Sequence, residues 1–149
     1  MKKITTILLS AMLAGAAFSA QAADEKVAPE QVPQGLRTFV AQHFGNDVKI
    51  VKAERDRKFD GFEYEVTLSN GAEIDYGVSG EWLEVDCDGV VISVPETIVN
   101  AAIVQHVKGT YPGTAIEKIT REYPGYEVKL SNGVELIYDN DYNFVRIDD

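Results

Sequence analysis

The side chains with the clearest chemical pattern are carboxylates that alternate with apolar residues along short extended segments. Glu63 and Glu65 alternate with Tyr64 and Val66, the period-two pattern of a strand with one buried face. Carboxylates collected on one face of a sheet bind cations, and two of them in a cleft can act as general acid and base. The spacing nominates no such pair, so it favours a binding surface over a catalytic one.

The predicted outward face of the first half combines acids with one aromatic ring, and a ring of this kind anchors interfaces because it buries a large area at low entropic cost. A second ring, Phe144, occupies the same position in the second half. The inward set is Tyr64, Val66, Leu68, Ile74, Tyr76, Leu83 and Val85. The candidate partner-binding residues are Trp82, Phe144, Glu63, Glu65, Glu73, Asp75, Glu84 and Asp86.

Two alternatives remain open for this face. Trp82 can instead be buried by a loop, by residues 23–31 or by a neighbouring ring. The carboxylates can simply form the solvated face of an antiparallel sheet.

The other reactive residue types form no catalytic or metal-binding set. His43 and His106 each lie near a helix end, where a lone histidine usually caps the helix or faces solvent, and they do not form a His-Glu-x-x-His motif. Residues 139–143 resemble the start of a calcium loop, but Phe144 replaces its required glycine, which favours a hairpin turn. Cys87, the only cysteine, is predicted to be a buried apolar side chain. We expect no enzyme activity, no catalytic residue, no cofactor and no metal site.

An internal repeat organises these residues. At an offset of 62, residues 64–71 (YEVTLSNG) fall on residues 126–133 (YEVKLSNG), with one difference. The same offset places Val32 and Pro33 on Val94 and Pro95, and Trp82 on Phe144. Each copy is therefore predicted to contain the same elements.

Each copy is predicted to be one helix followed by a four-stranded meander. Apolar residues recur at helical spacing over residues 33–44 and 95–108. Asn70-Gly71 and Asn132-Gly133 indicate two-residue hairpin turns whose central residues both have positive φ. The fold class is α+β: one antiparallel sheet of about eight strands, or two four-stranded sheets side by side, with both helices on one face.

The N-terminus and the charge define the compartment and the partners. Residues 1–22 have a basic start, an apolar stretch and Ala20-Gln21-Ala22, which together indicate a signal peptide. We divide the rest into a linker (23–31), repeat 1 (32–87), a connector (88–93) and repeat 2 (94–149), and expect a periplasmic or secreted protein with no membrane insertion after cleavage. A net charge of −10 argues against nucleic acid as a partner.

The repeated helix and meander, with the hairpin Tyr-Glu-Val-x-Leu-Ser-Asn-Gly, resembles the PepSY-like, β-lactamase-inhibitor-like family over residues 30–149. This resemblance implies an architecture similar to the β-lactamase inhibitory protein, whose exposed sheet face grips a partner protein. It implies a non-enzymatic binding module, an inhibitor or regulator of an extracytoplasmic enzyme such as a peptidase. The alternative is an acidic periplasmic protein that binds a small ligand or a divalent cation. Unlike the β-lactamase inhibitory protein, this chain has no cysteine pair for a disulfide.

Overall fold

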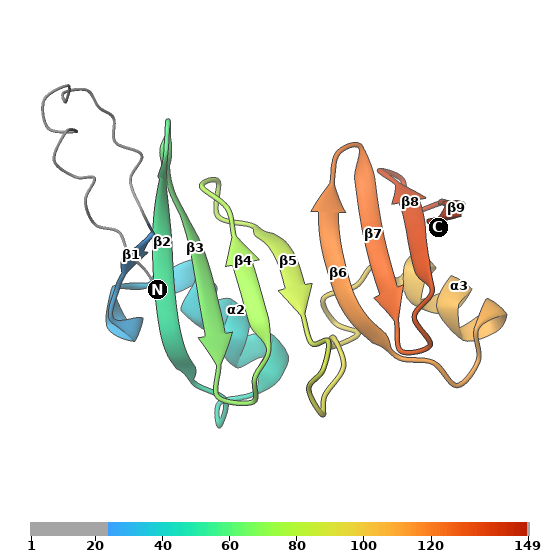
Figure 1. The fold of residues 1–149 in the computed structure, drawn as a ribbon, viewed down its shortest axis with the longest axis horizontal. Helices are drawn as coiled ribbons and strands as arrows, with labels where there is room; N and C mark the ends of the chain where they lie inside the picture. The colour runs from blue at the N-terminus through green and yellow to red at the C-terminus, as the bar shows by residue number, and fades with distance from the viewer. Residues whose placement is uncertain (1–23, 149) are drawn as a thin grey trace, which may run out of the picture.

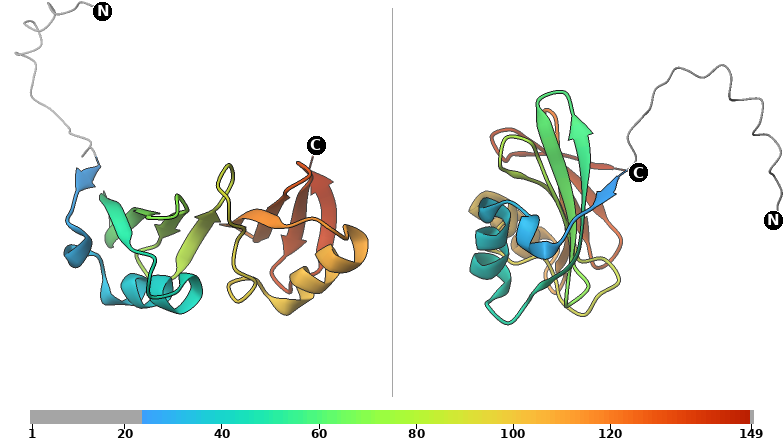
Figure 2. Two further views of the ribbon diagram at one scale, coloured as in Figure 1. Left: turned by 90° about the horizontal axis from the view of Figure 1, so that it is seen from below. Right: turned by 90° about the vertical axis from the view of Figure 1, so that its left-hand side faces the viewer.

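A computed structural model describes residues 24–148 and shows a single antiparallel sheet with two helices on one face (Figures 1 and 2). The predicted signal peptide lies outside the described residues. The strands are β1 (Glu25–Lys26), β2 (Ile50–Lys58), β3 (Gly61–Leu68), β4 (Glu73–Tyr76), β5 (Trp82–Asp86), β6 (Ile116–Glu122), β7 (Gly125–Leu130), β8 (Glu135–Asp139) and β9 (Phe144–Asp148). They lie side by side in sequence order. The predicted fold class is confirmed.

The repeats form one sheet because β5, the last strand of repeat 1, pairs with β6, the first strand of repeat 2. Val85 lies opposite Ile119, and Asp86 lies opposite Lys118. The sheet has nine strands rather than about eight, since residues 25–26 of the expected linker pair with Arg55 and Glu54 of β2. A 3₁₀ turn (Pro29–Gln31) then leads to the first helix.

Each helix packs its apolar stripe on the sheet of its own repeat. α2 (Gln34–Phe44) buries Leu36 and Val40, and α3 (Ala101–Thr110) buries Ile103 and Val107. The buried residues of both repeats belong to one core cluster. This sharing of a core suits two units that would each be marginally stable alone.

The second helix begins later than its sequence pattern predicts. Pro95 precedes turns rather than a helix, and α3 begins only after Asn100, whose side chain accepts a hydrogen bond from the Ala102 backbone amide at 2.8 Å. An asparagine in this position satisfies one of the amides that a helix start leaves free. Capping therefore sets the start of this helix.

The hairpin after β3 closes with one left-handed residue instead of two. The Leu68 amide donates to the Ala72 carbonyl, the Gly71 amide donates to Leu68, and only Gly71 has a positive φ, at 96°. Three-residue hairpin loops have this form, with glycine at the left-handed position. Asn70 instead accepts a hydrogen bond from the Ala72 amide through its side chain.

Candidate functional site

A depression in the open face of repeat 1, the face away from the helices, is lined mainly by carboxylates. Its volume is about 180 Å³. We call it the acidic hollow, and its lining residues are Asp24, Glu54, Arg55, Asp56, Glu63, Tyr64, Glu65, Asp75 and Leu83. The hollow can accept a cationic group, since six of these residues carry a carboxylate.

Strand pairing places four carboxylates in a row across this face. Glu54 lies opposite Glu65, Glu65 opposite Asp75, and Asp75 opposite Glu84. Directly paired side chains in an antiparallel sheet have Cβ atoms about 5 Å apart, and like charges at that spacing repel. The row therefore costs stability unless a cation compensates it.

Lysines of the chain form ion pairs only with the ends of the row and its surroundings, and the charge of Lys52 only partly offsets the raised pKa of Glu65. The Lys52 ammonium lies 2.8 Å from Glu54, and Lys58 lies 2.6 Å from Asp56 and 3.2 Å from Glu63. Within residues 24–148, no hydrogen bond or salt bridge reaches the carboxylate of Glu65 or Asp75, so the centre of the row keeps its negative charge unpaired.

The pKa values reflect this lack of compensation. Partial burial, followed by repulsion from Glu84 and Glu65, raises the pKa of Asp75 from 3.8 to about 6. The pKa of Glu65 is also raised, first by desolvation and then by Glu73 and Glu54. Perturbed carboxylates in a depression mark a candidate binding site.

Leu83 gives the hollow an apolar wall. The ladder between β4 and β5 shifts by one residue, because Asp75 pairs with Glu84 while Tyr76 pairs with Trp82. Leu83 is the extra residue of this bulge and lines the hollow instead of the core, so its predicted inward orientation is wrong. A leucine beside carboxylates suits the aliphatic stem and charged head of lysine or arginine.

The same bulge turns Trp82 to the helix side of the sheet. Trp82 is only 9% exposed, lies opposite the buried Tyr76, and contacts the Arg121 guanidinium, which is 4.2 Å from its ring centre. The predicted position of Trp82 on the open face is therefore wrong. The alternative that Trp82 is buried is therefore correct. The ring is buried because the register shift in β5 turns it to the helix side of the sheet.

Phe144 is displaced in the same way by a matching bulge in repeat 2. It pairs with Tyr138, and its ring stacks on His106 of α3 with 4.7 Å between ring centres. Its predicted place on the open face is also wrong. Unlike Trp82, Phe144 remains 41% exposed, because β9 is the last strand of the sheet.

The six predicted acids fall into two groups. Glu63, Glu65 and Asp75 line the hollow, and Glu73 lies beside it at the exposed start of β4. Glu84 and Asp86 instead belong to a polar network at the junction of the repeats.

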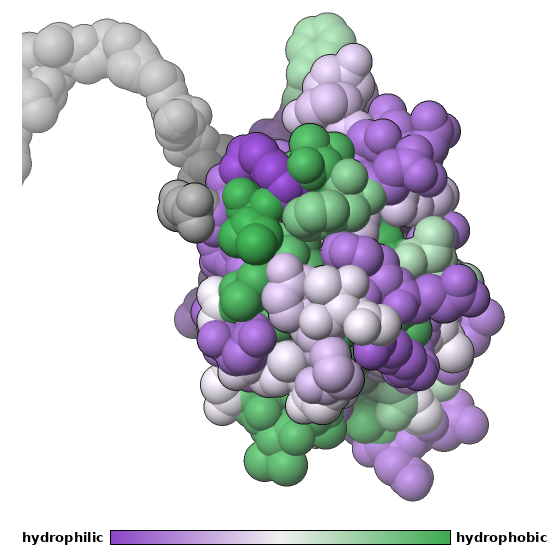
Figure 3. Space-filling view, turned by 90° about the vertical axis from the view of Figure 1, so that its right-hand side faces the viewer, coloured by the Kyte–Doolittle hydropathy of each residue, from purple (hydrophilic) through white to green (hydrophobic). Residues whose placement is uncertain are grey.

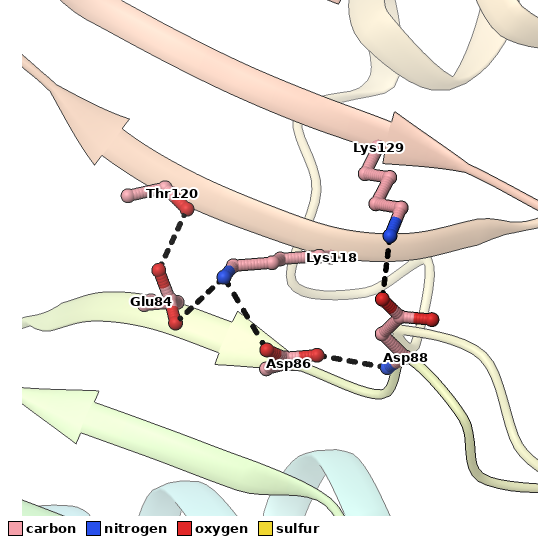
Figure 4. A network of polar contacts seen from close by, with 6 residues as sticks. All are labelled: Glu84, Asp86, Asp88, Lys118, Thr120 and Lys129. Carbon is pink, nitrogen blue, oxygen red and sulfur yellow. Dashed lines mark hydrogen bonds and ion pairs between the residues drawn. The ribbon is translucent and has the colours of Figure 1, made fainter. Parts of the chain in front are cut away.

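This junction network pairs acids of β5 and of the turn that follows it with lysines of repeat 2 (Figure 4). Lys118 lies 3.2 Å from Glu84 and 3.3 Å from Asp86, and the Thr120 hydroxyl donates to Glu84 at 2.9 Å. Lys129 pairs with Asp88 at 2.5 Å. These contacts make the β5–β6 seam part of the scaffold and neutralise the end of the row at Glu84.

Sequence reasoning missed the contribution of the N-terminal edge to the hollow. Asp24, Glu54 and Asp56 line it, yet residues 55–58 read as a connection because β2 is almost entirely charged there. The alternation of Glu54 and Asp56 with Ala53, which is buried, was the available signal.

The equivalent row in repeat 2 has lost its acidic character. Thr120, Glu127, Ile137 and Arg146 follow one another across β6 to β9 by direct pairing. At the offset of 62, Ile137 takes the place of Asp75 and Arg146 that of Glu84. The row of adjacent carboxylates is therefore confined to repeat 1.

The histidines and the cysteine have structural surroundings. His43 Nδ1 lies 2.8 Å from the Thr97 hydroxyl, and His106 Nδ1 lies 2.8 Å from the Tyr138 hydroxyl. Cys87 is buried, and desolvation raises the pKa of its thiol to about 11.

Asp139 closes a turn by accepting from the Asn143 and Asp141 amides. Between residues 24 and 148, no group of three or more His, Cys, Asp or Glu side chains is arranged to hold a metal ion.

Two tandem helix-and-meander units joined into one antiparallel sheet, with both helices on one face, define the class of fold. The family described as "Putative beta-lactamase-inhibitor-like, PepSY-like" matches residues 19–63 and 62–146. The chain belongs to this PepSY-like family, as its repeat predicted. Among curated proteins, no sequence matches the chain.

Solved structures from Bacteroides show the same fold. A protein of Bacteroides thetaiotaomicron, described as a "putative calcium-regulated periplasmic protein", is 39% identical, with a TM-score of 0.76 over 85% of this chain and 97% of that one. Two proteins of Bacteroides vulgatus, each described as a "putative periplasmic protein", are 34% and 31% identical, each with a TM-score of 0.76 over 85% of this chain. They cover 97% and 100% of those chains. No helix among residues 24–148 is long and apolar enough to span a membrane.

Proposed function

We propose that this protein is an exported, non-enzymatic binding module that takes a lysine or arginine side chain of a partner protein or peptide into the acidic hollow. The adjacent unpaired carboxylates of Glu65 and Asp75 carry this proposal. Their repulsion destabilises the free protein, and a bound cation relieves it. An extracytoplasmic enzyme such as a peptidase, inhibited or regulated through this face, is the partner class that the inhibitor-like family suggests.

The periplasm, or the outside of the cell, is the proposed location. The three Bacteroides proteins are described as periplasmic. The N-terminal pattern of residues 1–22 points to the same export route.

Titration with a short peptide that contains one lysine, beside the same peptide with that lysine acetylated, tests the proposal. We expect saturable binding that acetylation abolishes and that weakens with added salt, since the attraction is between charges. Glu65→Gln should weaken binding strongly. Equal binding of both peptides would show that the hollow does not recognise the ammonium group.

Glu127→Gln is the matched control, because Glu127 occupies the position of Glu65 in repeat 2. Both substitutions remove one charge from the same strand position and the same face. Equal weakening by the two variants would attribute binding to net charge and reject the hollow as the site.

A divalent cation, calcium in particular, is a second candidate ligand, favoured by the description of the B. thetaiotaomicron protein as calcium-regulated. Calcium takes six to eight oxygen ligands, so carboxylates of the hollow would have to converge further than they do here. Calorimetric titration with calcium and magnesium tests this candidate. No saturable heat at millimolar calcium, or heat that persists in Asp75→Asn, would eliminate it.

A further inference from the structure

The last strand of the sheet, β9, exposes an apolar edge at the end opposite the hollow (Figure 3). Phe144, Val145 and Ile147 are 41%, 54% and 46% exposed. No described strand pairs with its outer side. An edge strand of this kind offers both unpaired backbone groups and apolar side chains to another chain.

The internal repeat shows that β9 has the side chains of a covered strand. Its counterpart β5 has β6 on its outer side, and there Val85 is fully buried. Ile147, at the position equivalent to Val85, is 46% exposed. Repeat 2 therefore has an interior-type side chain, Ile147, on a strand whose outer side has no neighbour among residues 24–148.

The opposite edge of the sheet is protected. β1 covers the middle of β2 with charged residues, and Arg55 pairs with Glu25 at 2.9 Å. Short charged edge strands prevent addition of further strands. Head-to-tail growth of β9 onto β2 of another copy is therefore obstructed, whereas β9 of one copy remains open to β9 of another.

Residues 146–148 of β9 are complementary to themselves when a twofold axis passes through Ile147. With a twofold axis at Ile147, the two Ile147 side chains meet on the helix side, and Arg146 meets the partner's Asp148 on the open side. Axes at residue 146 or 148 would instead oppose two arginines or two aspartates, which repel. Within one chain Arg146 already pairs with Asp148, so the partner's carboxylate adds to an existing ion pair.

We propose that the protein forms a twofold dimer in which β9 pairs antiparallel with β9 of a second copy, centred on Ile147. Such a dimer is closed, because each copy uses the same edge and its other edge is capped. The two open faces lie on the same side, so the dimer presents two acidic hollows. This inference is independent of what the hollow binds.

Disulfide trapping of Ile147→Cys tests the register. Directly opposed residues have Cα atoms about 4.5–5.5 Å apart, within the range that a disulfide spans. We expect oxidation to link chains of the Ile147→Cys variant at least about tenfold faster than chains of the control Val51→Cys, because pairing raises the local thiol concentration. Val51 is a 59% exposed valine on β2, and the native Cys87 is buried. Equal rates would overturn the proposed register.

Sedimentation of the unmodified chain tests the dimer itself. We expect the mass to rise towards two chains with concentration, Ile147→Lys to abolish the rise, and Arg146→Asp to weaken it. The double exchange Arg146→Asp with Asp148→Arg should restore association, which a merely structural defect would not do. A wild-type chain that stays monomeric at millimolar concentration, or association that survives Ile147→Lys, would refute the dimer.

Discussion

Asp75→Asn should make the protein more stable while it weakens binding at the acidic hollow. The aspartate carboxylate lies half-buried between Glu65 and Glu84 in the cross-strand row and has no compensating partner among the described residues. Asparagine has nearly the same shape and no charge. The substitution therefore removes repulsion without leaving a cavity.

The size of the gain follows from the pKa of Asp75, raised from 3.8 to about 6. A carboxyl with a raised folded-state pKa binds its proton more tightly in the native state, so stability falls as the pH rises from about 4 to 6. A shift of about two units corresponds to roughly 3 kcal/mol, and solvent screening of a half-buried group reduces this to about 1–2 kcal/mol. We expect the melting temperature of the variant to exceed that of wild type by roughly 4–8 °C above pH 7.

Thermal melts from pH 3 to 8 at low salt measure this difference. The gain should be complete above pH 7 and should vanish near pH 3, where wild-type Asp75 is largely protonated in both the folded and the unfolded state. Asp47→Asn, at an exposed turn after α2, is the control and should show no such dependence. A variant that is less stable than wild type at pH 7.5, or equally stable at every pH, would refute the account of an uncompensated charge.

Two further predictions concern the scaffold. Trp82→Ala should lower the free energy of unfolding by about 3–5 kcal/mol because the ring is buried, whereas Phe144→Ala should cost only about 1 kcal/mol because its ring is 41% exposed. Urea unfolding measures both, and equal losses would contradict the assignment of Trp82 to the core. Gly125→Ala should cost about 2 kcal/mol or more, because its Cβ would lie 1.9 Å from the Tyr138 carbonyl oxygen in the β7–β8 ladder. The control Gly109→Ala, on α3 with open space around it, should instead stabilise by about 0.5–1 kcal/mol, and a loss as large as that of Gly125→Ala would contradict the clash.

The fold could be predicted from the sequence because of the internal repeat. A strand pattern of alternating residues followed by Asn-Gly appears twice, 62 residues apart. Each copy supports the interpretation of the other, even where one copy has a weak pattern. The starting residue of α3 was not accessible in the same way, since both Pro95 and Asn100 are suitable helix starts. The side-chain cap that Asn100 forms with the Ala102 amide sets the start at the later of the two.

Strict alternation predicted the wrong sheet face for Trp82 and Phe144. The extra residue of a bulge reverses the sheet face of every residue that precedes it in the strand. Leu83 occupies the bulge of β5, so Glu84 stays outward while Trp82 turns inward. Single-sequence alternation contains no signal for such a bulge. The acids Glu65 and Asp75 were placed correctly because they lie on strands whose pairing with each other is regular.

The two repeats carry different side chains at equivalent positions. Repeat 1 keeps Asp75 and Glu84 where repeat 2 has Ile137 and Arg146, and the resulting charge is tolerable only where a cation can reach it from solvent. Repeat 2, lacking that charge, carries an apolar last strand instead of a capped one. Charge repulsion at one end and an exposed apolar strand at the other both reduce the stability of an isolated chain. Because neither feature helps the fold, each is better explained by a contact outside the chain: a cation at the hollow and a second strand at β9.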